Sequence, residues 1–129
     1  MTDPRNRLQA LFDPAHRYSN FEAALVRMHV QGFRCHASTV IDVESPITAF
    51  CGLNGTGKST LLQLAACAYQ APVAQDARYY IRDFIVTGTL DPRPFSGDAT
   101  VEYGYWEESR SVRRIKVSRS ASEKALARL

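Results

Sequence analysis

The stretch Gly52-Leu53-Asn54-Gly55-Thr56-Gly57-Lys58-Ser59 fits the pattern G-x-x-x-x-G-K-[ST] at every fixed position, and this pattern predicts a loop that holds phosphate groups. The apolar run Ile47–Cys51 precedes it, which predicts a short buried strand. Helix-forming residues follow it up to residue 69, before Pro72. The order of strand, glycine-rich turn and helix predicts an α/β fold of the P-loop type, with a mixed sheet around residues 47–51.

Each residue type in this stretch has a chemical reason to bind a nucleoside triphosphate. Glycines let backbone N–H groups converge on phosphate oxygens, and the helix that begins at Gly57 directs its positive end to the same anion. Lys58 is expected to reach the β- and γ-phosphates, and the Ser59 hydroxyl to bind Mg²⁺. We therefore predict ATP and Mg²⁺ as ligands. The predicted binding residues of this stretch are Gly52, Asn54, Gly55, Thr56, Gly57, Lys58, Ser59 and Thr60.

One continuous domain, residues 25–129, is predicted to follow an N-terminal extension, residues 1–24. The extension is expected to form short helical turns around Leu11 and after Asn20. Strand-type residues then mark five further extended segments: Leu25–Val30, Thr39–Val43, 79–86, Thr100–Trp106 and Val112–Val117. Gly32 is expected to end the first of these segments. Few polar residues separate the last two segments, which predicts an antiparallel hairpin.

The composition argues against several classes of protein. Of 129 residues, 45% are hydrophobic and 22% charged, as in an ordinary globular domain. No window approaches the roughly 20 apolar residues of a membrane span, and the N-terminus does not resemble a secretory signal. Three cysteines without paired close spacing favour a reduced, cytoplasmic protein. Among them, Cys51 and Cys67 are expected to be buried as small hydrophobic residues.

Basic residues are concentrated at the end of the chain. Residues 1–109 hold nine Lys and Arg against twelve Asp and Glu, whereas residues 110–129 hold seven against one. Such a cluster can bind DNA or an acidic partner. The alternative is that its arginines pair with a missing C-terminal lobe, or with Glu102, Glu107 and Glu108 across the hairpin. The basic residues on or beside the second hairpin strand are Arg110, Arg113, Arg114, Lys116 and Arg119.

Aromatic residues in the first hairpin strand alternate between its two faces. Val101, Tyr103 and Tyr105 share one face, and Glu102 and Trp106 share the other. The first set is expected to pack in the core. A platform on which nucleic-acid bases stack is the alternative interpretation.

Three segments together resemble the N-terminal lobe of ABC-class ATPase heads: Gly32–His36, Thr39–Asp42 and Ile47–Leu62. The nearest likeness is to the SMC, RecF and double-strand-break repair ATPases, and to the related bacterial ATPases of phage-defence and OLD-type systems. The resemblance implies a partial ABC-type head that binds ATP and Mg²⁺ in DNA maintenance or antiviral defence.

The resemblance also assigns a role to the residues that follow the first strand. Arg34 would touch phosphate or ribose, with Cys35 as a second candidate and His36 as a weaker one. The alternative for Arg34 is a surface charge at a strand end.

The chain departs from that family in the residues that hydrolysis requires. Its 129 residues show no apolar strand ending in Asp-Glu, no signature loop resembling Leu-Ser-Gly-Gly and no recognisable switch histidine. The glutamine that the family places on Mg²⁺ stays open among Gln63, Gln70 and Gln75. We therefore assign no catalytic residue and expect no hydrolysis by the isolated chain.

The same departures predict a front lobe that a C-terminal lobe or a homo-oligomer completes. Two other functions stay open. One is a nucleotide-dependent interaction module without hydrolysis, and the other is the ATP-binding subunit of an ABC transporter.

Overall fold

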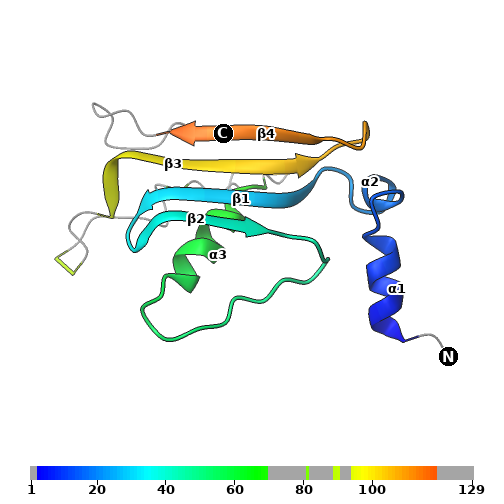
Figure 1. Cartoon of the computed structure of the whole chain (residues 1–129), viewed down its shortest axis with the longest axis horizontal. Helices are drawn as coiled ribbons and strands as arrows, with labels where there is room; N and C mark the ends of the chain where they lie inside the picture. Colours follow the sequence, from blue (N-terminus) through cyan, green and yellow to red (C-terminus); the bar gives the residue numbers. More distant parts are fainter. Residues whose placement is uncertain (1–2, 70–80, 82–88, 91–93, 119–129) are drawn as a thin grey trace, which may run out of the picture.

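The computed structural model describes residues 3–69, 81, 89–90 and 94–118. Its helices and strands are, in chain order, α1 (Pro4–Leu11), α2 (Arg17–Phe21), β1 (Ala24–Phe33), β2 (His36–Asp42), α3 (Lys58–Ala66), β3 (Phe95–Trp106) and β4 (Val112–Ser118). The strands form one sheet in the order β2-β1-β3-β4, and each neighbouring pair is antiparallel. Figure 1 shows α3 against the sheet and α1 and α2 at one end of it. The strand expected at 79–86 falls outside the described residues except for Ile81.

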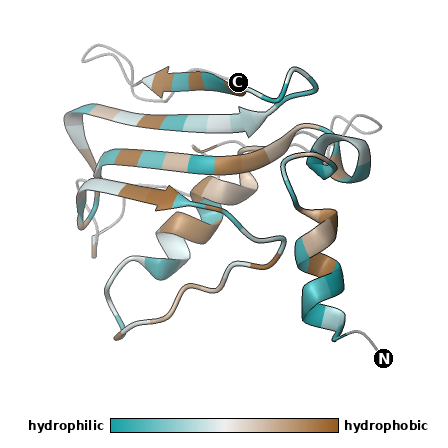
Figure 2. Ribbon diagram, turned by 45° about the vertical axis from the view of Figure 1, so that its right-hand side comes forward, coloured by the Kyte–Doolittle hydropathy of each residue, from teal (hydrophilic) through white to brown (hydrophobic). Residues whose placement is uncertain are grey.

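Alternation along the strands places hydrophobic side chains on the face that α3 covers. Met28 and Val30 of β1 lie opposite Tyr103 and Val101 of β3, and Leu64 of α3 packs in the same cluster. Each of these five side chains is at most 1% exposed. Figure 2 shows the resulting change between hydrophobic and hydrophilic residues along the strands. The core therefore lies between α3 and this face, and the predicted hairpin of β3 and β4 is confirmed.

Two tyrosines of β3 attach α3 to the sheet. The Tyr103 hydroxyl donates a 2.7 Å hydrogen bond to the Leu64 carbonyl, and the Tyr105 hydroxyl donates one to the Ala68 carbonyl. The Leu64 carbonyl lies in the last turn of α3, where carbonyls lack partners further along the helix, and the Ala68 carbonyl lies just beyond the C-cap Cys67. The two hydroxyls supply the hydrogen-bond donors that the helix does not. Packing of Tyr103 and Tyr105 in the core is thus confirmed, and burial prevents them from stacking on bases.

We expect the tyrosine contacts to make stability fall in alkaline solution. Burial raises the pKa of Tyr105 from 10.0 to about 12, so the unfolded chain loses this proton first as the pH rises. The stabilisation is complete below about pH 10 and is lost as the pH approaches 12. Urea unfolding of wild type and Tyr105→Phe should show a stability difference that shrinks over this range. A difference independent of pH would contradict this account.

The apolar segment Ile47–Cys51 is not the central strand that its composition predicts. It has no regular structure, and Ile47 is 74% exposed. A strand needs a neighbour to satisfy its backbone N–H and C=O groups, and within the described residues no strand pairs with this segment. The expected mixed sheet is likewise wrong for the described strands, which are all antiparallel. Figure 2 draws much of the loop between β2 and α3 in the brown of hydrophobic residues.

The N-terminal extension packs on the end of the sheet through one buried cation. The Arg17 guanidinium lies 4.2 Å from the centre of the Phe12 ring and 5.0 Å from that of Trp106. Its Nε donates a 2.8 Å hydrogen bond to the Phe12 carbonyl. The helical turn expected after Asn20 is wrong, because α2 ends at Phe21 and the Asn20 side chain donates to the Leu11 carbonyl.

Candidate functional site

The glycine-rich loop curls around its own lysine. Nζ of Lys58 donates hydrogen bonds of 2.8 Å to the Gly52 carbonyl and 2.6 Å to the Leu53 carbonyl. The Thr56 hydroxyl donates a 2.8 Å bond to the same Leu53 carbonyl. The ammonium group is therefore held by neutral acceptors, which form weaker hydrogen bonds than a charged phosphate oxygen does.

Helix α3 begins where this loop ends. Gly57 is its N-cap with a φ of 83°, a left-handed conformation that glycine adopts without steric cost. The Leu61 N–H donates to the Gly57 carbonyl at 3.1 Å, whereas the N–H groups of the first turn have no acceptor within a helix. These groups and the helix dipole favour an anion at this end.

An open cavity of about 540 Å³ lies at this end of α3. The residues that line it are Arg34, Cys35, Asn54, Gly55, Gly57, Lys58, Ser59 and Thr60. The structure thus brings Arg34 together with the loop, while Gly52 and Thr56 belong to the loop but not to the lining. No Asp or Glu is among the described lining residues. With two cations and no acid there, the cavity favours a negatively charged ligand.

Arg34 reaches the cavity from the turn between β1 and β2. Its backbone has a φ of 47°, and its N–H donates a 2.8 Å hydrogen bond to the Pro94 carbonyl. One guanidinium nitrogen donates to the Thr60 hydroxyl at 2.9 Å, and Thr60 is buried.

Gly32, which was expected to end the strand, instead lies within β1 at an irregularity in its pairing with β3.

The Ser59 hydroxyl is the described group best suited to Mg²⁺. Ser59 is exposed and lines the cavity beside Lys58, and an oxygen donor is what this hard cation prefers. Among the residues that the structure describes, no cluster of three His, Cys, Asp or Glu side chains could hold a metal. Mg²⁺ would therefore take its other ligands from phosphate and water, as it commonly does.

His36 contacts the glycine-rich loop from β2, although it is not among the residues that line the cavity. It is 6% exposed, and its Nε2 lies 3.1 Å from the Gly57 carbonyl oxygen. The resemblance gave His36 as a weaker candidate than Arg34 for contact with nucleotide, and its position two residues after Arg34 is the signal that the sequence offers. The contact of His36 is with the loop itself.

The three cysteines differ in their surroundings. Cys67 is buried as expected, whereas Cys35 and Cys51 are exposed. The predicted burial of Cys51 is wrong: it rested on the apolar residues beside Cys51 in the sequence, and of these Phe50 packs partly against the core while Cys51 stays exposed.

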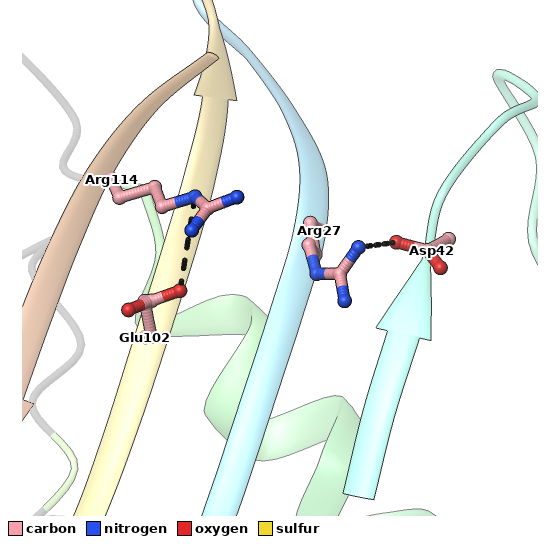
Figure 3. A network of polar contacts seen from close by, with 4 residues as sticks. All are labelled: Arg27, Asp42, Glu102 and Arg114. Atoms are coloured by element: carbon pink, nitrogen blue, oxygen red, sulfur yellow. Dashed lines mark ion pairs between the residues drawn. The ribbon is translucent and has the colours of Figure 1, made fainter.

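The basic residues of β4 are partly paired with acids. Nε of Arg114 lies 4.0 Å from a carboxylate oxygen of Glu102, and Arg113 pairs with Glu107. Figure 3 shows Glu102 and Arg114 beside a second pair, Arg27 and Asp42, which are 3.2 Å apart. Pairing across the hairpin, one of the two interpretations of the sequence, is thus confirmed for these arginines.

A comparison with known families gives a match for most of the chain. The model of an AAA domain matches residues 27–123, which include the glycine-rich loop, Arg34 and β4. A search of curated proteins finds no match. No helix among the described residues has the length and hydrophobicity needed to cross a membrane. Because the match covers 97 of the 129 residues, this chain belongs to the AAA domain family.

Proposed function

We propose that this chain is the ATP- and Mg²⁺-binding lobe of an SMC/RecF-like ATPase. Membership of the AAA domain family supports an ATPase-like nucleotide-binding function. The observation that carries the proposal is the cavity at the start of α3, which Arg34 and Lys58 line without a described acid. A chain of phosphates is the part of a nucleotide that suits such a site.

The lining residues would have distinct tasks. Lys58 would exchange its two carbonyl acceptors for phosphate oxygens, which bind an ammonium group more strongly. The N–H groups at the start of α3 would bind the same phosphates. Ser59 would hold Mg²⁺, which would neutralise part of the phosphate charge. Arg34 would supply a second cation beside the phosphates.

The segment Ile47–Cys51, of which all residues but Phe50 are exposed, supports the proposal that a further lobe completes the head. Its residues carry no charge, and Ile47 and the nearby Leu53 are 74% and 82% exposed. A strand from a C-terminal lobe would satisfy the backbone of this segment and cover its side chains. A second copy of the chain is the other occupant, and the oligomeric state in solution separates the two.

The role in DNA maintenance or phage defence rests on the resemblance of residues 27–70 to the SMC and RecF ATPases. A reduced cytoplasmic location is part of this proposal, and so is contact with DNA through the exposed Lys116 of β4, which lies outside the two ion pairs of Arg113 and Arg114. An interaction module that binds nucleotide without hydrolysis is the second candidate, which the lack of an acid among the described lining residues favours. In the full gene, a following heptad pattern would favour an SMC-type protein, and a short helical subdomain would favour a transporter subunit.

The isolated chain is expected to bind Mg-ATP without hydrolysing it. The cavity supplies groups for phosphate, but its described lining includes no Asp or Glu that could bind the metal or orient the attacking water. Calorimetric titration should give heat with Mg-ATP and none with adenosine, and a phosphate-release assay should stay at background. Absence of binding would refute the proposed function. Release of phosphate that Lys58→Ala abolishes would show that another acid of this chain serves as the catalytic group.

A further inference from the structure

The turn between β1 and β2 contacts the start of α3 through three consecutive residues. Arg34 donates to the Thr60 hydroxyl, Cys35 lines the cavity beside Gly57, and His36 contacts the Gly57 carbonyl. A Cβ atom added to Gly57 would lie 2.6 Å from the Cys35 sulfur and 2.2 Å from His36 Nε2. The hairpin turn and the loop are therefore packed against each other without space for one methyl group.

The His36 ring is fixed at both nitrogens. A carbonyl oxygen only accepts hydrogen bonds, so Nε2 carries the hydrogen in its 3.1 Å contact with Gly57. Nδ1 lies 3.0 Å from the Thr39 hydroxyl, which donates to it when the ring is neutral. The ring thus joins β2 to the last residue before α3 with its orientation set from both sides.

The bond to the Gly57 carbonyl also orients a donor on the other side of the same peptide group. The C=O of Gly57 and the N–H of Lys58 belong to one peptide unit, and in a trans peptide they point in opposite directions. The described backbone contains no cis peptide bond. A His36 ring that holds the carbonyl on one side therefore directs the Lys58 N–H away from the ring, towards the open end of α3.

We propose that His36 is a positioning residue for phosphate binding, acting through the Gly57–Lys58 peptide group without touching the ligand. This inference rests on the proposed function, because its ligand is the phosphate chain of the nucleotide. The Leu61 N–H donates to the same carbonyl oxygen. His36 and the first hydrogen bond of the helix therefore both fix the orientation of this peptide group.

The test compares two replacements of His36. His36→Phe keeps a ring but removes the donor, and we expect Mg-ATP affinity to fall about tenfold, the loss of one hydrogen bond. His36→Gln can place an amide N–H near the position of Nε2, and its affinity should stay within about threefold of wild type. The matched control is His29→Phe, because His29 Nε2 pairs with the Ser38 hydroxyl at 3.0 Å on another part of the same hairpin.

A readout without nucleotide keeps this inference separate from the proposed function. Hydrogen exchange of the Leu61 amide in the ligand-free protein should be about fivefold faster in His36→Phe than in wild type, and unchanged in His29→Phe. If wild type binds no Mg-ATP, the proposed function fails and this exchange still tests the contact. If His36→Phe does not fold, the same two measurements are made on Thr39→Val. This variant removes the hydroxyl that contacts Nδ1 of His36.

Two results would overturn the proposal. One is a His36→Phe variant whose Mg-ATP affinity and whose Leu61 amide exchange both equal those of wild type. The other is a His36→Gln variant as weak as His36→Phe, which would show that the shape of the ring, and not its donor, matters.

Discussion

Lys58→Ala is expected to weaken Mg-ATP binding at least about 100-fold, to below detection in a calorimetric titration. The variant loses the ammonium group that would bind the phosphates. It also removes the ammonium donor from the Gly52 and Leu53 carbonyls, of which Leu53 still accepts from the Thr56 hydroxyl. Both effects weaken the binding of Mg-ATP, because the cavity then carries less positive charge and its loop is less ordered.

The control for this experiment is Arg27→Ala, which also removes one positive charge. Arg27 pairs with Asp42 on the strands β1 and β2 and is not part of the cavity lining. Its Mg-ATP affinity should match that of wild type within about twofold, because exposed charges at a distance are screened by salt. Equal heats for wild type and Lys58→Ala would remove the phosphate-binding assignment of the loop.

Gly57→Ala is expected to destabilise the protein far more than Gly55→Ala. Both glycines have left-handed backbones, with φ values of 83° and 80°, so the backbone strain of alanine is about 1–2 kcal/mol at each. A Cβ at Gly57 would lie 2.2 Å from His36 Nε2, whereas a Cβ at Gly55 would meet nothing within 4 Å. The overlap should add about 1–3 kcal/mol at Gly57 alone.

Urea unfolding of the two variants without ligand measures this difference. The gap between their free energies of unfolding isolates the overlap with Cys35 and His36, because the effects of alanine on the unfolded chain and on φ are shared. A gap close to zero would mean that the hairpin turn gives way without cost. The Gly57→Ala variant should also lose Mg-ATP affinity, since the displaced turn carries Arg34.

The sequence predicted the parts of the structure that depend on local pattern. Alternation of Val101, Tyr103 and Tyr105 predicted which face of β3 is buried. The fixed positions of the glycine-rich stretch predicted the loop and the start of α3. Both patterns act within a few residues, so they could be recognised without knowing what packs against them.

Other features depend on partners distant in the sequence, and these could not be predicted in the same way. Burial of Ile47–Cys51 requires a neighbouring strand, which its composition cannot supply. The bond of His36 to Gly57 joins residues 21 positions apart, and that between Arg34 and Thr60 joins residues 26 apart. Only the resemblance to a family pointed to Arg34 before the structure did.

The segment Ile47–Cys51 also governs how the chain behaves at high concentration. Its five residues carry no charge and no proline, and all but Phe50 are exposed, which is the composition of segments along which identical chains add strands to one another. Aggregation would begin there, and a lysine at Ile47 would act as a gatekeeper against it. During synthesis this segment leaves the ribosome before anything that follows it can fold, so the interval until it is covered is when a nascent chain is most exposed to misassembly.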